Sequence, residues 1–433
     1  MALLAQLRRL KRRPMFSPRQ WKRRVAFLFG AVLVAVIAIL FAHAGTWAGN
    51  VFNTLTKGRP WMFFILCPGG LGVSVWLTQR FFQGAQGSGI PQAIAALHME
   101  PEHQNRVMSA RVAVAKVGLC ILGLVCGASI GREGPTVQIG AATMHGLGRV
   151  LKLPRADVRQ ALILAGGAAG IAGAFNTPIA GVVFAIEELG HSVHLRSLGA
   201  PLYAVVLGGI ATVGIAGNYT YFGTTDAALG WGIGWVAVLI AGVLGGLAGG
   251  LFARLLVDGA RLWPAPIRRL AVRSPVAFAV LCGLVLALVG LATNGSALGS
   301  GYDPAKAMVE QTAGMPSSAL LFTIAKFIAT TASYLSGMPG GIFAPSLAVG
   351  SGLGAALAPL VPAASAGALV LLGMVAYFSG VVQAPLTATV IVMEMTNNQG
   401  LTVPLMATAL IAMQASRLVC RKPLYGVLAK RFH

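Results

Sequence analysis

Long apolar runs separated by short polar stretches make up most of this chain. Many runs approach the roughly 20 residues that a helix needs to cross a lipid bilayer. They lie at approximately 25–45, 60–78, 108–130, 133–150, 160–189, 198–217, 230–256, 274–293, 317–336, 342–361, 366–396 and 401–419. The pattern therefore predicts an all-α polytopic membrane protein with short loops.

Gly and Pro interrupt many of these runs. The breaks are Pro68-Gly69-Gly70, Gly87-Ser88-Gly89-Ile90-Pro91, Gly131-Arg132-Glu133-Gly134-Pro135, Pro339-Gly340-Gly341 and Ala384-Pro385. Broken helices are tolerated in a membrane only where protein or a cavity satisfies the freed backbone groups. The breaks therefore predict discontinuous and re-entrant helices that meet at a site within the membrane.

The broken motifs recur along the chain. Gly131, Pro135 and Gly140 match Gly341, Pro345 and Gly350, and Asn176-Thr177-Pro178 with Glu187 matches Gln383-Ala384-Pro385 with Glu394. The alternative is chance similarity between Gly-rich apolar segments. We expect two homologous halves, 25–222 and 229–433, and paired broken segments in corresponding places point to a transporter site at the bilayer midplane.

Composition changes the picture by excluding whole classes of protein. Of the 433 residues, 56% are hydrophobic and 10% are charged, whereas a soluble domain is normally about a quarter charged. A soluble enzyme and a disordered chain are thus disfavoured. The formal net charge of +22 alone would favour nucleic acid, but the hydropathy overrides it, and we predict no nucleic-acid partner.

The N-terminus combines a basic arm, 1–24, with an apolar run that ends near Ala42-His43-Ala44. This order imitates a signal peptide, but the arm is too long and the run is long enough to span. We expect an uncleaved first helix. The basic arm and the basic C-terminal end predict two cytoplasmic termini in a multi-pass plasma (inner) membrane protein in contact with anionic lipid.

Acidic residues are scarce, and four of the 11 lie inside apolar runs: Glu133, Glu187, Glu188 and Glu394. A charge at the bilayer centre costs about 2.5–3.5 kcal/mol on insertion scales. Each of these carboxylates must therefore be neutralised, paired or placed beside a water-filled path.

Glu133 precedes Pro135, which fits the first turn of a helix. Glu133 would then stand among free backbone amides that attract anions. The carboxylate could occupy an anion site itself and leave when protonated, which would make a proton-coupled gate. A capping carboxylate that never moves is the equal alternative.

Two further helix starts share this chemistry. Ser88 precedes one start, where its hydroxyl could bind a halide-sized anion or simply act as an N-cap. The amides of Ile342 and Phe343 stand at another start, before Pro345. Three such N-termini aimed at one point would make an anion site without burying a full Lys or Arg.

The other buried charges have several open interpretations. Glu187 and Glu188 diverge by about 100° on a helix, so one could relay protons while the other pairs or caps. Glu394 is expected to form structural hydrogen bonds. Lys116 and Lys326 could each pair with an acid, supply positive potential or snorkel to the interface.

At this point four motifs together resemble the CLC family of chloride channels and chloride/proton antiporters of bacterial type. They are Gly87-Ser88-Gly89-Ile90-Pro91, Gly131-Arg132-Glu133-Gly134-Pro135, Gly341-Ile342-Phe343-Ala344-Pro345 and Lys422-Pro423-Leu424-Tyr425, in family order. The resemblance implies the CLC fold of two inverted-topology helical halves, a homodimer and one anion pathway in each subunit.

The resemblance also implies roles for individual residues. Ser88 and Tyr425 would contact the anion through their hydroxyls, and the amides of Ile342 and Phe343 would complete the site. Glu133 would be the external gate and Glu188 the internal proton-transfer group. The remaining accessory candidates are Gly87, Gly134, Lys116 and Glu187.

The function implied is membrane transport of chloride as a chloride/proton exchanger. Gln92 and Ile94 stand where some relatives carry acids, and this departure favours the alternative of an uncoupled chloride channel. The chain stops eight residues after Tyr425, so we expect no soluble CBS domain.

An intramembrane enzyme is the third class, with His98, His103, His191 and His194 as its available ligands. No metalloprotease motif accompanies them, and the five Cys show no metal-ligand spacing. We expect no enzymatic activity, no metal and no cofactor, and small buried hydrophobic roles for the cysteines.

Overall fold

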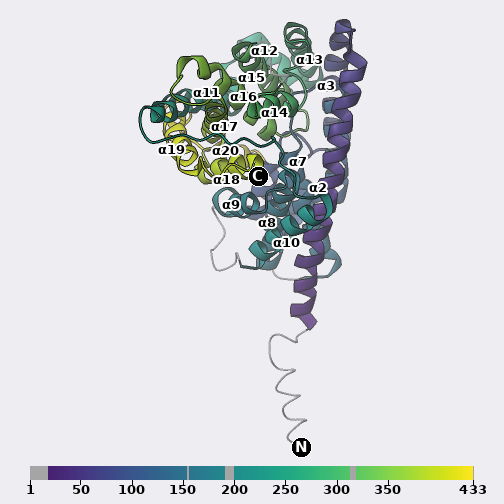
Figure 1. Ribbon diagram of the computed structural model, residues 1–433. Helices are drawn as coiled ribbons and strands as arrows, with labels where there is room; N and C mark the ends of the chain where they lie inside the picture. The colour runs from purple at the N-terminus through teal and green to yellow at the C-terminus, as the bar shows by residue number, and fades with distance from the viewer. Residues whose placement is uncertain (1–17, 154–155, 191–198, 313–317, 433) are drawn as a thin grey trace, which may run out of the picture.

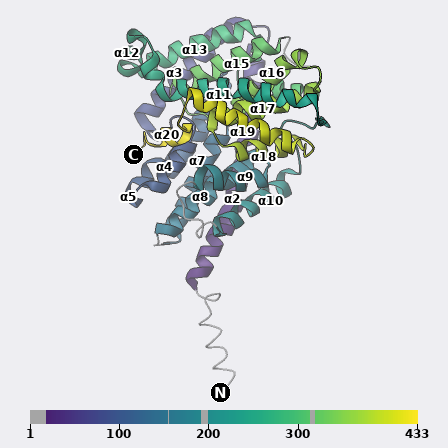
Figure 2. The ribbon, with the colours of Figure 1, turned by 90° about the vertical axis from the view of Figure 1, so that its left-hand side faces the viewer.

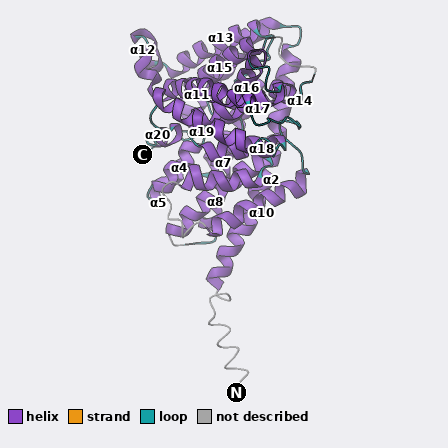
Figure 3. Cartoon of the chain, turned by 60° about the vertical axis from the view of Figure 1, so that its left-hand side comes forward, coloured by secondary structure: helices purple, strands orange, loops and turns teal. Residues whose placement is uncertain are grey.

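The computed structural model describes residues 18–153, 156–190, 199–312 and 318–432, and their regular structure is almost entirely helical (Figure 3). The only β-type pairings within these ranges are two isolated bridges, Gly87 with Pro339 and Gly131 with Gly341. The long apolar runs account for this outcome, because a helix satisfies all its backbone groups within one segment.

The first part of the chain forms α2 (Pro18–Thr56), η2 (Pro60–Met62), α3 (Phe63–Phe81), α4 (Ile90–His98), α5 (Pro101–Met108), α6 (Ala110–Val125), α7 (Glu133–Val150), α8 (Ala156–Phe175), α9 (Pro178–Phe184), the π-helical turn η3 (Ala185–Leu189) and α10 (Gly199–Ala216). The second part forms η6 (Ile233–Trp235), α11 (Val236–Leu262), α12 (Ala265–Arg273), α13 (Pro275–Ala292), α14 (Tyr302–Glu310), α15 (Ala319–Leu335), α16 (Phe343–Leu357), η7 (Ala358–Leu360), α17 (Ala366–Val382), α18 (Pro385–Thr396), α19 (Thr402–Val419) and α20 (Leu424–Ala429).

Eight helices within the described ranges are long and apolar enough to cross a membrane. Four shorter apolar helices accompany them: Pro201–Ala216, Ala319–Leu335, Ala366–Val382 and Pro385–Thr396. The helix α2 runs along one side of the molecule (Figure 1), and the other helices pack beside it in a single body (Figure 2). The all-α polytopic fold predicted from the sequence is confirmed.

Some predicted boundaries were wrong. The first helix begins at Pro18 rather than after residue 24 and continues to Thr56 rather than to 45. Lys and Arg are good helix formers, so the basic segment 18–24 extends the apolar helix. The runs 160–189 and 366–396 are each divided at a proline, Pro178 and Pro385, which cannot continue the preceding helix, and the repeated motifs predict these two breaks.

The two parts of the chain repeat the same packing. The helix α7 packs on α8 as α16 packs on α17, and α3 pairs with α13 across the two parts. A Cβ on Gly350 would lie 2.5 Å from the Gly373 carbonyl oxygen, and Gly140 meets Gly166 in the same way. These contacts support the halves 25–222 and 229–433, a division that stays a prediction.

The second repeated motif also has one backbone shape. Asn176 and Gln383 end α8 and α17 with φ values of +58° and +60°. Thr177 and Ala384 follow with φ values of −129° and −120°, before the prolines that begin α9 and α18. The chain therefore makes the same turn after α8 and after α17. Both of these helices are deeply buried and form the centre of the molecule.

Candidate ion-binding site

Three loops that precede helices meet inside the molecule. The Gly131 amide donates to the Gly341 carbonyl (2.7 Å) and the Gly341 amide donates back (2.8 Å). The Gly87 amide donates to the Met338 carbonyl (3.2 Å), and the Gly340 amide donates to the Gly87 carbonyl (3.0 Å). These bonds bring the N-termini of α4, α7 and α16 together, as the motifs predict.

Ser88 lies on the first of these loops and is 1% exposed. The N-cap of α4 is Gly89 rather than Ser88, so the simple N-cap interpretation of Ser88 is wrong. Its hydroxyl has no hydrogen-bond partner among the residues that the structure describes. Gly134 packs directly on Ser88, because a Cβ there would lie 2.8 Å from the Ser88 carbonyl oxygen. A buried free hydroxyl is costly, and a bound anion would satisfy it.

Tyr425 reaches the same place from α20, which packs on α4. Its side chain is fully buried and its hydroxyl, like that of Ser88, has no hydrogen-bond partner in the described chain. The Tyr425 ring stacks on Phe343, with centroids 6.2 Å apart and planes 11° apart. The Tyr425 hydroxyl lies close to Ser88, so two unpartnered hydroxyls face one spot.

The helix α16 supplies the third side. Ile342 is its N-cap and Phe343 its first residue, and both are 1% exposed. The first amides of a helix have no partner within it, so they can donate to an anion. Phe343 is held by aromatic contacts with Phe378 (4.5 Å), Phe175 (5.8 Å) and Phe184 (6.1 Å).

Glu133 is the first residue of α7 and is fully buried. Its carboxylate lies near the backbone amide of Ala344 in the first turn of α16. The Oε1 atom accepts a hydrogen bond from the Tyr302 hydroxyl, whereas Oε2 has no hydrogen-bond partner within the described part of the chain. The carboxylate therefore lies where the N-termini of α7 and α16 meet, with one oxygen uncommitted.

The neighbouring Arg132 is 7% exposed. It donates to the Ala42 carbonyl of α2 and to the Thr46 hydroxyl (3.3 Å). Its guanidinium stands 5.1 Å from the Tyr221 ring centroid and 5.4 Å from that of Tyr302. The cation is thus held away from a direct ion pair with Glu133 while still lying close to it.

Lys116 and Lys326 are both fully buried. The Lys116 ammonium donates to the carbonyls of Ala85 and Gly87, both at 2.7 Å. The Lys326 ammonium donates to the carbonyls of Ala297 (3.2 Å) and Gly299 (2.7 Å). Snorkelling and pairing with an acid are therefore not their roles, and each holds a loop in place by donating to its carbonyls from a buried position.

Glu187 and Glu394 cap each other's broken helices. Glu187 accepts from the amides of Leu386 (3.1 Å) and Thr387 (2.6 Å) at the start of α18. Glu394 accepts from the amides of Ile179 (3.1 Å) and Ala180 (2.8 Å) at the start of α9. The expected structural role of Glu394 is thereby explained, and Glu187 is the member of the Glu187–Glu188 pair that caps.

Glu188 stands apart from this capping. It lies in η3, half-buried beside Glu187, and within electrostatic reach of Tyr425. It is therefore the member of the pair that remains available near the proposed anion site.

Gln92, the residue that replaces an acid, is buried in the first turn of α4. Its Nε2 donates to the carbonyls of Gly84 (3.3 Å) and Gln86 (2.5 Å), and its Oε1 accepts from the Gly89 amide (3.0 Å). All three partners belong to the segment that carries Ser88. Gln92 thus shapes the Ser88 loop.

Tyr302 escaped prediction from the sequence, although a signal for it exists. Gly299-Ser300-Gly301-Tyr302 repeats the Gly87-Ser88-Gly89-Ile90 motif in the second half. The similarity of the two motifs is hard to see because their prolines stand at different positions: Asp303 and Pro304 follow Tyr302, whereas Pro91 follows Ile90 directly.

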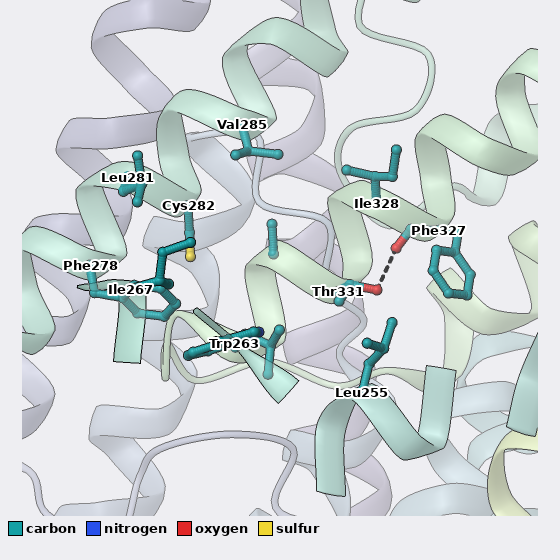
Figure 4. A pocket seen from close by; sticks show the side chains of 12 residues that line it. Leu255, Trp263, Ile267, Phe278, Leu281, Cys282, Val285, Phe327, Ile328 and Thr331 are labelled. Atoms are coloured by element: carbon teal, nitrogen blue, oxygen red, sulfur yellow. Dashed lines mark hydrogen bonds between the residues drawn. The ribbon is translucent and has the colours of Figure 1, made fainter. Parts of the chain in front are cut away.

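A hollow of about 330 Å³ lies elsewhere, between α11, α13 and α15 (Figure 4). Its walls are mainly apolar and include Leu255, Trp263, Phe278, Cys282 and Ile328. The one hydroxyl in its lining, on Thr331, donates to the Phe327 carbonyl at 2.7 Å. A hollow of this kind suits lipid rather than an ion path.

Metal chemistry finds no support in the described residues, where no group of three His, Cys, Asp or Glu side chains could hold a metal ion. His191 and His194 lie outside the described residues. All five cysteines are free and buried, which confirms their predicted roles as small hydrophobic residues.

Broken helices, buried charges and free hydroxyls at a junction are typical of polytopic ion-transport proteins, whose sites lie within the membrane. The family described as voltage gated chloride channel matches residues 69–417. The chain belongs to this family, the CLC family that the sequence motifs resemble.

Several relatives are similar along most of their length. The H(+)/Cl(-) exchange transporter ClcA of Yersinia pestis is 33% identical over 377 residues, which are 82% of this chain and 75% of the relative. The protein of the same name from Klebsiella pneumoniae is 31% identical and covers 95% of this chain and 89% of its own. These named proteins are transporters.

Solved structures show the same fold. The structure of a slow cyanobacterial Cl-/H+ antiporter has a TM-score of 0.75 and 26% identity, and it covers 96% of this chain and 98% of its own. A eukaryotic CLC transporter has a TM-score of 0.79 and 23% identity, and it covers 96% of this chain and 75% of its own. The predicted CLC fold is thus confirmed.

Proposed function

We propose that this protein exchanges chloride for protons across the membrane. The observation that carries the proposal is the arrangement of Glu133, Ser88 and Tyr425 around one buried point. Among the described residues, the two hydroxyls have no hydrogen-bond partners, and one carboxylate oxygen of Glu133 has none either. Buried polar groups are normally hydrogen-bonded. The two free hydroxyls can therefore donate to an anion, and the free oxygen of the Glu133 carboxylate can take up a proton.

In this proposal Ser88, Tyr425 and the amides of Ile342 and Phe343 bind chloride. Their donors give anion selectivity without a cation in the pathway, because helix N-termini favour negative charge. Lys116 adds positive potential from behind the Ser88 loop, where it is fully buried. Gly87 and Gly134 allow the loops to approach closely.

Glu133 is the external gate. While ionised it competes with chloride for the positive ends of α7 and α16. When it takes up a proton it loses this attraction and moves away, so proton uptake and chloride passage are linked. Two relatives whose names include H(+)/Cl(-) exchange, at 31% and 33% identity, support the exchange that this gate would serve.

Glu188 is the internal proton-transfer group. Its position within reach of Tyr425 supports this role, because a proton passing between Glu188 and Glu133 has the anion site between them. Glu187 is the capping neighbour and not the carrier, because both its carboxylate oxygens accept from amides of α18. Chloride and protons are therefore the proposed substrates.

We further propose a homodimer in the plasma membrane with both termini cytoplasmic. The helices α9, α10, α18 and α19 lie together and expose large apolar side chains. Examples are Ile179 (57%), Ile210 (58%) and Val403 (59%). Crosslinking of the purified protein in lipid tests the dimer, and protease access to the basic arm in oriented vesicles tests the topology.

Coupled flux in proteoliposomes tests the exchange. An outward chloride gradient should drive protons inward against their own gradient. Glu188→Gln should abolish the proton movement and spare chloride flux. Glu187→Gln is the matched control from the adjacent position, and it should remain coupled. Chloride flux without proton movement in the unaltered protein would overturn the proposal.

The second candidate is an uncoupled chloride channel on the same fold. Gln92 and Ile94 favour it, because neither is an acid and both stand where some members of the family carry one. A channel would give pH-gated chloride flux with no proton movement, in the unaltered protein as in Glu188→Gln.

A further inference from the structure

The loop before α14 is a second copy of the Ser88 loop. Gly299-Ser300-Gly301 repeats the sequence of Gly87-Ser88-Gly89. Gly87 and Gly299 have φ values of +64° and +65°, and Gly89 and Gly301 have +106° and +84°. Only glycine adopts such conformations without strain, so the backbone as well as the sequence is repeated.

The same lysine contact holds both loops. Lys116 donates to the carbonyls of Ala85 and Gly87, and Lys326 donates to those of Ala297 and Gly299. The acceptors occupy equivalent positions in the two loops. A buried ammonium with carbonyl partners fixes each loop more firmly than neutral hydrogen bonds would.

The second loop presents Tyr302, the first residue of α14, to the site. Its hydroxyl donates to Oε1 of Glu133 across the two halves of the chain. Its ring is held by Tyr221 (4.3 Å between centroids) and Phe222 (5.4 Å). The hydroxyl is therefore positioned by a fixed loop on one side and an aromatic group on the other.

We propose that Tyr302 is a positioning residue that holds the Glu133 carboxylate in the anion pathway and thereby sets the pH at which the gate releases. The proposal rests on the exchange function proposed above. The hydrogen bond is strongest when Glu133 is ionised, because a charged acceptor roughly doubles the strength of such a bond. Tyr302 therefore stabilises the seated, ionised gate against the released, protonated one.

The other groups that face Glu133 are few. Arg132 precedes it, Cys120 faces it from α6 and Tyr425 from α20. The amide of Ala344 faces it from α16. Tyr302 is the hydroxyl donor that the described structure bonds to this carboxylate, so removing that one hydroxyl changes the balance without altering a charge.

The test is chloride turnover as a function of pH in proteoliposomes containing Tyr302→Phe. This variant keeps the ring and removes the hydroxyl. Without the bond the seated carboxylate is less stable, so the rise of turnover on acidification should move to higher pH by about one unit. At neutral pH, turnover should increase roughly tenfold.

Tyr221→Phe is the matched control, because it removes a buried hydroxyl with no hydrogen-bond partner from the same aromatic group. Its pH profile should equal that of the unaltered protein. In a Glu133→Gln background, Tyr302→Phe should have no effect on the profile. An unchanged profile for Tyr302→Phe alone, in a protein that still folds, overturns the proposal.

A second measurement serves if Tyr302→Phe fails to fold. Infrared difference spectra of the unaltered protein with ring-labelled tyrosine should show one tyrosine band that shifts together with a carboxyl band of Glu133. Both changes should be missing from Glu133→Gln, and a tyrosine band that does not follow the carboxyl band overturns the proposal. Failure of the exchange function would appear separately, as chloride flux without proton movement in the unaltered protein.

Discussion

The loops before α4 and α14 have the same sequence core, the same positive φ values and the same lysine contact, yet they leave different groups at the site. The first leaves the Ser88 hydroxyl without a hydrogen-bond partner in the described ranges. The second brings Tyr302 to Glu133. The same loop conformation thus has two uses. In one loop it leaves the Ser88 hydroxyl free for an anion, and in the other it directs the Tyr302 hydroxyl to a carboxylate.

The difference shows how the functions of the two loops diverge. Both loops are fixed close to α7. Ser88 packs on Gly134 in α7, and its hydroxyl has no hydrogen-bond partner among the described residues, whereas the longer Tyr302 side chain donates to the Glu133 carboxylate at the start of α7. The two loops therefore share their backbone shape and their contact with a buried lysine, and they differ in the side chains that they bring to the site.

The largest effect is expected from Glu133→Gln, which keeps the size of the side chain and removes its titration. Proton movement should be lost completely, and chloride flux should no longer depend on pH, because a neutral amide cannot follow the proton. Proton uptake and chloride efflux measured in the same vesicles check this. Persistent coupled proton movement would contradict the assignment of Glu133 as the gate.

The two lysines offer a direct test of the comparison. Lys116→Met frees the Ser88 loop and should weaken chloride binding roughly tenfold, because the loop loses charged hydrogen bonds. Lys326→Met frees the Tyr302 loop, and it should move the pH profile in the direction of Tyr302→Phe. Titration calorimetry with chloride and the pH dependence of flux distinguish them. Equal loss of chloride affinity in both variants would show that the loops do not have separate roles.

The smallest effect is expected from the reciprocal caps. Glu187→Gln and Glu394→Gln each keep one acceptor oxygen but lose the charge that favours a helix N-terminus. Each should lower the free energy of unfolding by about 1 kcal/mol and leave transport coupled. Thermal unfolding in detergent measures the first effect and vesicle flux the second. A large loss of stability in only one of the two variants would contradict the equivalence of the two caps.

The sequence predicted the fold and the meeting of the broken helices well, because both follow from local rules. Apolar runs long enough to span must be helical, and Pro and Gly mark where the helices break. The repeated Pro178 and Pro385 motifs predicted the matched breaks before α9 and α18. Local rules also explain the boundary error at Pro18, where basic residues continued a helix that hydropathy alone would end.

The contacts between distant segments were beyond such rules. Nothing in the segments around Glu187 and Glu394 indicates that each caps the other's helix, because the pairing depends on how the halves are placed in space. Tyr302 could not be assigned to Glu133 for the same reason. For Lys116 and Lys326 the sequence alone does not distinguish an ion pair, a source of positive potential and snorkelling, because their carbonyl partners lie in distant segments.

The most direct test of exchange is the reversal voltage of chloride flux in proteoliposomes with equal chloride on both sides and a pH difference across the membrane. A coupled exchanger must show a reversal voltage that is not zero and that changes sign when the pH difference is inverted. This is the result that the proposed roles of Glu133 and Glu188 predict. A reversal voltage of zero at every pH difference would contradict them and identify an uncoupled channel.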